Sequence, residues 1–456
     1  MDENRELIET ISVALKNKRF NEIKEILGHL EAFDIALLMH EFDMRDLIVM
    51  FRLLPKNLAA EVFVEFDSDY QEELISTFSD RDLKEIFDEL YLDDTVDILE
   101  EMPANVVKRI LKNSDADTRR WINELLNYPD DSAGSIMTIE YVRLRADMTV
   151  KEAFNRIRLE GVEKETVYTC YVTDSERNLI GVITVLEMLL ADENTVIGEI
   201  MTADVISVST HEDKEVVANK FKQYDFFVLP VVDAEGRLVG IATIDDAVDV
   251  IVEESTEDIE KMAAITPSEK PYLKTSAFSL FMARIPWILI LMVSSTFTGL
   301  IITEFESALA AQATLTAFIP MIMGTAGNTG SQSSVTVIRA LSLNDVEFSD
   351  IFRVQWKELR VSILCGLTLA VFTFAKILLF ENLIMGQEVS TTVSLIVSLT
   401  LAFTVVCAKF VGCTLPLLAK KLGFDPVVMA SPFITTIVDA VSLVIYFVLA
   451  TSILKL

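Results

Sequence analysis

One acidic residue, Asp439, lies in the middle of the last apolar segment of this 456-residue chain. Thirteen uncharged residues (426–438) precede it and fifteen (440–454) follow it. A carboxylate at that depth in a lipid bilayer costs about 2.5 kcal/mol or more, so it should face a water-filled cavity or a cation. The alternative is a protonated carboxyl group that is hydrogen-bonded between helices.

A polar segment, PMIMGTAGNTGSQSS (320–334), interrupts another apolar run and could supply oxygen ligands. Its proline and glycines should loosen a helix and free backbone carbonyl groups, which are tolerated at membrane depth only beside protein or water. With Asp439, this segment could line a pathway for a hydrated cation. The alternative is close helix packing by small residues. The residues concerned are Pro320, Gly324, Gly327, Asn328, Gly330 and Gln332.

The available ligands favour a hard divalent cation, magnesium first. Magnesium prefers six oxygen ligands and gives up its waters reluctantly, so one or two carboxylates and other polar oxygens suit it. A soft metal would use histidine and cysteine, but His29, His40 and His211 lie outside the apolar segments and the cysteines show no CxxC spacing. Lys409, inside the fourth apolar run, is interpreted as a lysine that snorkels to the membrane surface.

Further carboxylates cluster in the first 275 or so residues, which carry most of the net charge of −31. Such an acidic surface repels nucleic acid and attracts cations. Carboxylates three or four residues apart share a helix face and repel one another unless a cation neutralises them. The alternative for each is an ordinary solvated face. The clustered residues are Asp93 and Asp97, then Asp245, Asp246 and Asp249, and finally Glu254, Glu257 and Asp258.

Five apolar segments must position Asp439 and the polar segment, since about 20 apolar residues suffice to span a bilayer. The loops after the second and fourth segments are rich in lysine and arginine, which places them in the cytosol. The N-terminus is then cytosolic and the C-terminus external, and no signal peptide is expected at the N-terminus. The segments cover about 283–303, 312–338, 361–380, 389–415 and 427–450.

An internal repeat between residues 135 and 250 is the clearest pattern in the first half. Each copy reads as strand, helix, strand, hairpin turn, strand and helix. The first copy contains SIMTIEYVRLRADMTVKEAFNRI and YTCYVTDSERNLIGVITVLEML; the second contains EIMTADVISVSTHEDKEVVANKF and FFVLPVVDAEGRLVGIATIDDAV. The repeat resembles a tandem pair of CBS domains, which implies a regulatory module that binds a nucleotide such as ATP, or dimerises.

Residues 1–130 read as short amphipathic helices in which LLPKNLAAEVF recurs as EMPANVVKRIL about 48 residues later. Pro55 and Pro103 are expected at helix starts. The pattern predicts an acidic, superhelical all-α N-domain. The complete prediction is a multi-domain chain with this N-domain (1–130), an α/β tandem CBS pair (131–252), a connecting helix (253–280) and a five-span α-helical membrane domain (281–456).

These features, with the GNTGSQ motif and the Asp439 segment, together resemble the MgtE magnesium transporters along the whole chain. The resemblance implies a homodimer in the plasma membrane whose pore is formed by the second and fifth spans of both subunits, with Asp439 binding the ion. It implies channel-like conduction that intracellular magnesium shuts off. That magnesium would bridge the N-domain to the CBS pair, and the connecting "plug" helix to the membrane domain near Asp425. Asp213, Glu215 and Asp225 join the candidate ligands on the same basis.

Three other function classes fit the sequence less well. A membrane-anchored nucleotide sensor without conduction would have no use for Asp439 or for the polar second segment. A chloride channel with CBS domains carries them after its spans, and an intramembrane carboxylate would oppose an anion. An enzyme is disfavoured because the sequence shows no Ser/His/Asp set and no phosphate-binding loop.

Overall fold

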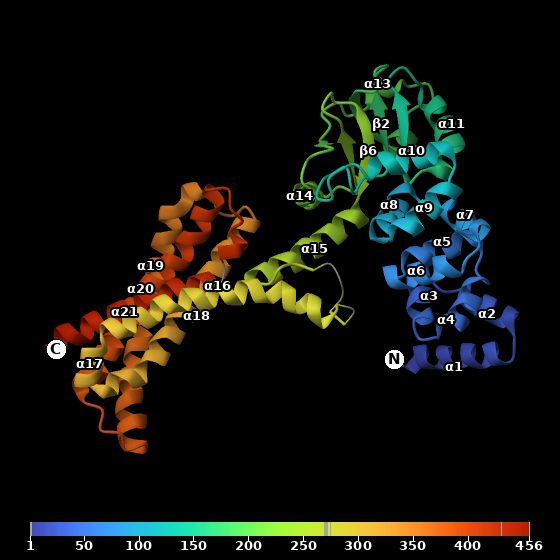
Figure 1. Ribbon diagram of the computed structural model, residues 1–456. Helices are drawn as coiled ribbons and strands as arrows, with labels where there is room; N and C mark the ends of the chain where they lie inside the picture. Colours follow the sequence, from blue (N-terminus) through green and yellow to red (C-terminus); the bar gives the residue numbers. More distant parts are fainter. Residues whose placement is uncertain (1, 269–271, 274, 430, 456) are drawn as a thin grey trace. The chain divides into compact units, whose positions relative to one another are not determined.

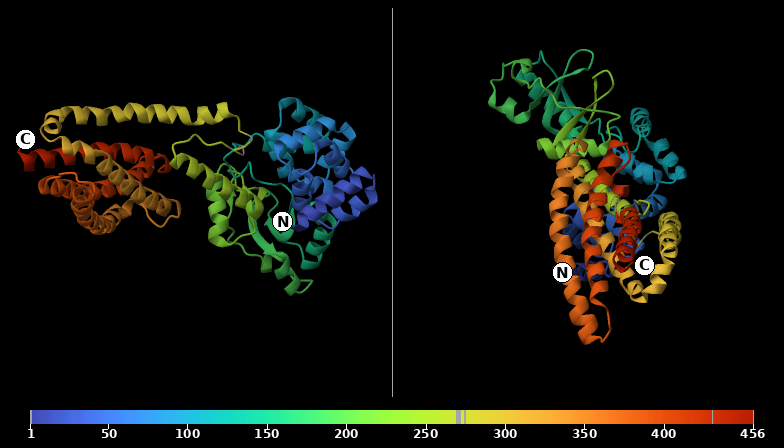
Figure 2. Two further views of the ribbon diagram at one scale, coloured as in Figure 1. Left: turned by 90° about the horizontal axis from the view of Figure 1, so that it is seen from below. Right: turned by 90° about the vertical axis from the view of Figure 1, so that its left-hand side faces the viewer.

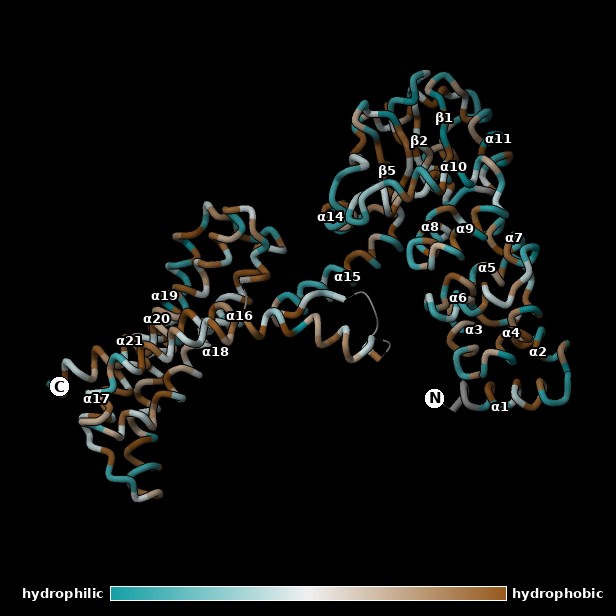
Figure 3. Tube along the Cα trace, viewed as in Figure 1, coloured by the Kyte–Doolittle hydropathy of each residue, from teal (hydrophilic) through white to brown (hydrophobic). Residues whose placement is uncertain are grey.

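The computed structural model describes residues 2–268, 272–273, 275–429 and 431–455 (Figure 1). It divides into two compact units, Met1–Ile251 and Val252–Leu456, and each is treated by itself. In the second unit, hydrophobic residues recur along the helices (Figure 3), and many large apolar side chains are exposed. Exposed apolar helix faces of this extent are typical of helices that contact lipid.

The N-terminal part of the first unit is built of short helices. Apolar residues three and four positions apart, such as Leu47, Met50 and Phe51, are buried in a core that successive helices share. Pro55 and Pro103 stand immediately before α5 and α9, as expected from the sequence. The helices are α1 (Asp2–Lys16), α2 (Phe20–Leu27), α3 (Ala32–Met39), α4 (Met44–Phe51), α5 (Lys56–Val64), α6 (Ser68–Thr77), α7 (Asp80–Phe87), α8 (Leu92–Glu101), α9 (Ala104–Asn113) and α10 (Ala116–Leu125).

The sequence repeat folds into two three-stranded sheets of the same topology. In each sheet the first two strands are parallel and joined by a helix, and the last two form the predicted hairpin. The first copy comprises β1 (Tyr141–Arg145), α11 (Val150–Glu160), η1 (Gly161–Glu163), β2 (Thr166–Thr173), β3 (Leu179–Thr184), α12 (Val185–Leu190) and α13 (Ile197–Ile200). The second comprises β4 (Val208–Ser209), α14 (Lys214–Tyr224), β5 (Val228–Val232), β6 (Leu238–Thr243) and α15 (Ile244–Met262).

The two sheets join through their hairpins. The Leu179 amide donates to the Gly236 carbonyl at 3.1 Å, and the Leu238 amide donates to the Arg177 carbonyl at 3.0 Å. Gly236 takes a left-handed φ of 83°, which the tight turn requires. A buried cluster of Tyr141, Tyr171, Leu238 and Ile241 lies between the sheets.

The predicted connecting helix over 253–280 is wrong in its extent. Helix α15 begins already at Ile244 and ends at Met262, and the next helix starts at Ala277. Ala264 adopts a left-handed φ of 54°, and the Ile265 amide donates back to the Glu260 carbonyl at 2.9 Å. This left-handed cap ends the helix, and Pro267 follows it. Residues 269–271 and 274 of the predicted helix lie outside the described residues.

Four helices among the described residues are long and apolar enough to cross a membrane: Ala277–Glu304, Phe348–Ile384, Thr391–Lys421 and Pro432–Leu454. Helix α18, over the predicted second span, has 24 residues but is too polar in the middle to join them. Length and composition therefore identify four spans among the described residues, one fewer than the five predicted. The elements are α16 (Ala277–Glu304), α17 (Glu306–Ala311), η2 (Ala313–Phe318), α18 (Ile319–Ser342), η3 (Phe348–Asp350), α19 (Ile351–Lys376), the π-helical η4 (Ile377–Ile384), α20 (Thr391–Lys421), η5 (Val427–Met429) and α21 (Ser431–Leu454).

Helices α18, α20 and α21 form the packed centre of the second unit. Buried side chains such as Ile322, Ile396 and Tyr446 lie between them. Helix α16 runs beside the bundle (Figure 2) and contains no buried residue, although Trp287 contacts Phe433 of α21 with ring centroids 5.9 Å apart. The polar helix α18 is thus held in the centre of the unit, and α16 lies at its edge.

Candidate metal sites

Asp439 lies on α21 beside the backbone of α18. A Cβ atom placed on Gly327 would lie 3.7 Å from the Asp439 Oδ1 atom and 3.1 Å from the Thr435 Cγ2 atom. Gly327 therefore leaves room for the half-buried carboxylate next to the α18 main chain. The structure brings together the two features that the sequence singled out for ion conduction, the acidic residue and the glycine-rich segment.

The glycines of α18 serve close packing, and the prediction of a loosened helix is wrong. Helix α18 is continuous from Ile319 to Ser342, with Pro320 in its first turn. A Cβ atom on Gly412 of α20 would lie only 2.3 Å from the Gly330 carbonyl oxygen, and a Cβ atom on Gly330 would lie 2.9 Å from the Ile434 Cγ2 atom of α21. Because small residues let neighbouring backbones come close, the helix keeps its own hydrogen bonds while packing tightly.

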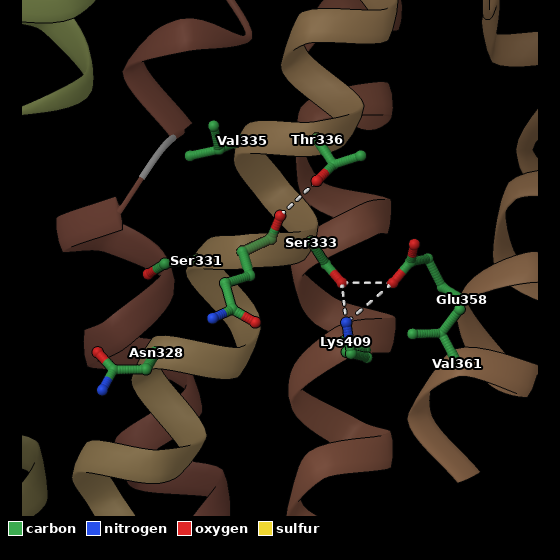
Figure 4. Close-up of a pocket in the computed structure, with 9 residues that line it drawn as sticks. Asn328, Ser331, Ser333, Val335, Thr336, Glu358, Val361 and Lys409 are labelled. Carbon is green, nitrogen blue, oxygen red and sulfur yellow. Dashed lines mark hydrogen bonds and ion pairs between the residues drawn. The ribbon is translucent and has the colours of Figure 1, made fainter. Parts of the chain in front are cut away.

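One face of α18 carries exposed polar side chains. Asn328, Gln332 and Thr336 recur every four residues and are exposed, and Gly324 continues the same face. The face borders a cavity of about 770 Å³, which we call the α18 cavity (Figure 4). Its lining residues are Asn328, Ser331, Gln332, Ser333, Val335, Thr336, Glu358, Val361 and Lys409.

Lys409 does not snorkel to the membrane surface. Its side chain is 6% exposed, and its ammonium nitrogen lies 3.3 Å from Glu358 Oε2 of α19 and 3.2 Å from Ser333 Oγ of α18. The Glu358 carboxylate forms an ion pair with Lys409, and this partner could not be recognised from the sequence of α20 alone. The interpretation as a snorkelling residue is therefore replaced by a buried ion pair.

In the first unit, Asp93 of α8 meets two carboxylates from the first sheet, Glu140 and Glu165. One carboxylate oxygen from each of the three lies within 4.8 Å of the others. Glu140 and Glu165 directly precede the paired strands β1 and β2, and the Glu165 amide donates to the Glu140 carbonyl at 2.9 Å. The Leu92 amide at the start of α8 donates to Glu140 Oε2 at 3.3 Å, so this contact docks the N-domain on the sheet.

The carboxylates around this contact have raised pKa values, chiefly because they are buried. Asp93 is 8% exposed, and burial followed by the charge of Asp246 raises its pKa well above the ordinary value. Burial and the charge of Asp245 raise the pKa of Asp94 to about 6 and that of Glu165 to about 8. Burial is also the first cause that raises the pKa of Glu140, of Glu65 (with Asp249) and of Asp246, the last to about 7.

These values predict that acid stabilises the first unit in metal-free buffer. A carboxyl group with a raised folded pKa contributes stability below its unfolded pKa of about 4, and this stability is lost as the pH rises through the folded pKa. The window therefore extends from about 4 to about 8, the pKa of Glu165. Scanning calorimetry of the full-length protein should show an unfolding temperature of the first unit that falls across this window. A flat profile would contradict the prediction.

Three carboxylates with raised pKa values fit a divalent cation. Glu165 Oε2 is buried without a hydrogen-bond partner in the described part of the chain, and a cation at the shared point would satisfy it. A second charged contact lies in the other unit. Lys261 of α15 places its ammonium nitrogen 2.8 Å from Glu257 and 3.1 Å from Asp425, so a lysine lies between two of the predicted metal ligands.

Known proteins and family models match this chain along most of its length. Family models match three parts of the chain: the MgtE divalent cation transporter over 319–449, the MgtE intracellular N domain over 30–131, and CBS domains over 133–194 and 197–253. The magnesium transporter MgtE of Thermus thermophilus is 36% identical over 98% of each chain. This chain belongs to the MgtE family. MgtE of Bacillus subtilis is 30% identical and covers 98% of this chain and 97% of that one.

Two solved structures of parts of magnesium-transporting proteins are similar to about half of this chain. The cytosolic domain of the Mg²⁺ channel MgtE in complex with ATP is 38% identical, with a TM-score of 0.51, and covers 53% of this chain and 99% of that chain. The soluble part of a magnesium transporter is 30% identical, with a TM-score of 0.52, covering 55% and 99%. The MgtE family consists of magnesium transporters rather than enzymes.

The other predicted ligands of this MgtE-family chain lie in varied places. Asp245, Asp246 and Asp249 start α15 and face Asp94, Asp93 and Glu65 of the N-domain closely enough to influence the pKa values described above. Asp97 is exposed on α8, whereas Glu254 and Asp258 are half-buried on α15. Asp213 caps α14, Glu215 is exposed in its first turn, and Asp225 ends it with a left-handed φ of 54°. The carboxylate group described above contains none of these three.

Sequence reasoning missed Glu140, Glu165, Glu358 and Lys261 as partners. A signal existed for the first two, because each stands directly before a strand of the same copy of the repeat. Parallel neighbouring strands begin at the same sheet edge, so residues before them lie side by side. No comparable local signal marks Glu358, whose partner is 51 residues away along the chain.

Proposed function

We propose that this magnesium transporter is a magnesium-selective, channel-like importer of the plasma membrane that intracellular Mg²⁺ closes. The observation that carries the proposal is the half-buried Asp439 carboxylate against the backbone of α18, next to an exposed polar helix face. A carboxylate with amide and hydroxyl oxygens nearby suits Mg²⁺, which keeps several of its waters. Asn328 and the carbonyl group of Gly324 are proposed as further contacts for the hydrated ion.

The polar face of α18 supports a homodimer in which α18 spans the membrane together with the four apolar helices. Asn328, Gln332 and Thr336 are exposed within one copy, and polar groups that face lipid are costly. A second copy that faces the same stripe would cover it and enclose a polar path flanked by two Asp439 residues. Basic residues that follow α18 and that end α20, such as Arg353, Lys420 and Lys421, favour a cytosolic N-terminus and an external C-terminus.

Exposed apolar residues on the first CBS domain also favour a second copy as partner. Leu159, Val162, Tyr168, Leu186 and Leu190 are all at least 65% exposed, although each belongs to a folded helix, turn or strand. An apolar surface of this kind on a soluble domain marks an interaction site. Because the membrane domain is proposed to be dimeric, a second copy of this chain is the proposed occupant of this surface.

The closing mechanism is proposed from the carboxylates that meet in the first unit. When Mg²⁺ is scarce, the charges of Asp93, Glu140 and Glu165 oppose docking of the N-domain on the CBS pair; a bound ion removes this opposition. Mg²⁺ thereby favours the state that offers the bridging site. Asp97, Asp213, Glu215, Asp225, Asp245, Asp246, Asp249, Glu254 and Asp258 are kept as proposed peripheral ligands, and the CBS pair as a proposed ATP site because a similar cytosolic domain was solved with ATP.

The contact between α15 and the membrane domain yields a separate prediction. Lys261 already links Glu257 to Asp425, so replacing Lys261 by methionine leaves two carboxylates that only a cation can bridge. The difference in protease sensitivity of the connecting segment between Mg²⁺-free and Mg²⁺-saturated protein should therefore grow. Lys151→Met, which removes an exposed pair with Glu193, is the matched control. An unchanged difference in the Lys261 variant would show that lysine and metal do not share this site.

Transport by the purified full-length protein in proteoliposomes tests the proposal as a whole. We expect Mg²⁺ to flow down its gradient without added nucleotide, with a lower flux for Ca²⁺, and to stop when Mg²⁺ is supplied on the side of the cytosolic domains. Protein-free liposomes set the background. A flux no higher than that background would refute the channel-like importer, whatever the regulation of the cytosolic domains.

A further inference from the structure

Three helices of the second unit meet in a buried charged cluster beside the α18 cavity. Ser333 of α18 donates to Glu358 Oε2 of α19 at 2.5 Å, and Lys409 of α20 lies within 3.3 Å of both (Figure 4). Ser333 is 1% exposed, and the Lys409 and Glu358 side chains are 8% and 13% exposed. The cluster therefore contains one ammonium group and one carboxylate with almost no access to solvent.

The cluster borders the same cavity as the polar face of α18. Asn328 and Gln332 line the cavity together with Glu358 and Lys409. Ser333 is six residues along the helix from Gly327, which faces Asp439. At about 1.5 Å per residue, the two levels are separated by roughly 9 Å along the helix axis. Because six residues also turn an α-helix so that the two positions point about 120° apart, the charges of the cluster lie farther than this from an ion at Asp439. They still lie within the range over which a charge acts on a divalent ion at low dielectric constant.

Stability alone is a poor explanation for this ion pair. Removing two charges from water costs more than a well-packed apolar pair of the same volume, and ionisable residues inside membrane helices usually have a functional role. Close packing at this level is already provided by Gly330 and Gly412. An ion pair has an electrostatic effect that an apolar pair lacks, because each of its charges acts on a nearby ion unless the other charge compensates it.

We propose that Glu358 and Lys409 are specificity-determining charges at the side of the ion path, an inference that rests on the proposed function. Lys409 and the Ser333 hydroxyl hold the Glu358 carboxylate so that a passing Mg²⁺ cannot bind it, and Glu358 in turn cancels the positive charge of Lys409. The cavity wall is polar yet carries no net charge. The ion therefore meets one carboxylate from each copy, Asp439, and is released from it.

Single neutralisations of the pair should have opposite effects on Mg²⁺ flux. Glu358→Gln leaves an ammonium group that repels Mg²⁺, so the half-saturating Mg²⁺ concentration rises. Lys409→Met leaves a carboxylate that retains Mg²⁺, so this concentration falls while the maximal flux also falls. At a separation of about 15 Å and an effective dielectric constant of about 20, one charge changes the occupancy by a divalent ion on the order of 40-fold. The double variant should restore wild-type values.

A purely structural pair would give a different pattern. Both single variants would then lose maximal flux with the half-saturating concentration moving in the same direction, and this result would overturn the proposal. Wild-type protein measured in the same liposomes separates a failure of the proposed function from a failure of this inference. An absence of Mg²⁺ flux in the wild type would refute the channel-like importer and not the role of the Glu358–Lys409 pair. If a single variant does not fold, the half-saturating Mg²⁺ concentrations of Glu358→Asp and of the double variant are measured in its place. Both keep the net charge and should retain the wild-type half-saturating concentration; a large shift in both would contradict the proposal.

Discussion

Replacing Asp439 by asparagine is expected to reduce Mg²⁺ flux by on the order of 100-fold. Each factor of ten corresponds to about 1.4 kcal/mol, and the contact between a charged ligand and a divalent ion contributes more than about 1.4 kcal/mol. Asparagine has nearly the same shape, so the contacts with Gly327 and Thr435 persist. What disappears is the negative charge beside the α18 backbone. Flux of purified protein in liposomes, and growth of cells that lack other magnesium importers, measure the effect.

The asparagine variant also separates the two interpretations of Asp439. If the residue were a protonated carboxyl group that only joins helices, the asparagine amide could replace it and flux would persist. Glu388→Gln is the matched control, because Glu388 is an exposed acidic residue in the loop before α20. Wild-type flux in the Asp439 variant would disprove the assignment of the ion path. Loss of flux in the Glu388 variant as well would point to a general effect of charge at the membrane.

Neutralising the three carboxylates of the first unit is the second change with a large expected effect. The variant Asp93→Asn, Glu140→Gln, Glu165→Gln should close only at Mg²⁺ concentrations on the order of ten-fold higher or more, because a Mg²⁺ ion loses its carboxylate ligands. The same variant should unfold at a higher temperature in metal-free buffer, because buried charges that repel one another are gone. Flux at varied Mg²⁺ on the cytosolic side and calorimetry measure the two effects.

The second prediction is specific because its two effects have opposite signs: closure by Mg²⁺ becomes weaker while the unfolding temperature rises. A variant that merely disrupts the contact between α8 and the sheet would lose both Mg²⁺ response and stability. Glu72→Gln with Glu73→Gln is the matched control, since these exposed acidic residues of α6 lie in the same unit but are neither in the three-carboxylate group nor among the proposed ligands. An unchanged Mg²⁺ response in the triple variant would mean that the regulatory ion binds elsewhere.

Local patterns in the sequence predicted most of the elements. The spacing of apolar residues gave the helices of the N-domain, and the repeat gave both sheets with their hairpins. The apolar segments predicted α16, α19, α20 and α21. Helix termination was less predictable. Helix α15 ends where Ala264 adopts a left-handed conformation, and no glycine marks that position in the sequence.

The residues that contribute to the candidate sites were predictable only in part. Asp439 and Asp93 were recognised because a carboxylate is unusual in an apolar segment, and because two carboxylates share one helix face. The glycines of α18 were recognised but misinterpreted. Whether a glycine loosens a helix or admits a neighbour depends on what packs against it, here Asp439 and Thr435 at Gly327 and Ile434 and Val438 at Gly330.

The sequence by itself determined the membrane helices, the CBS repeat, the helical N-domain and the acidic residue of the last helix, since each depends on a periodicity or a composition within one segment. Only the tertiary structure decided which charges meet: Glu140 and Glu165 with Asp93, Lys261 with Asp425, and Glu358 with Lys409. The physical reason is that an electrostatic contact depends on distances of a few ångströms between segments far apart in the chain. Those distances are set by how the helices and sheets pack together.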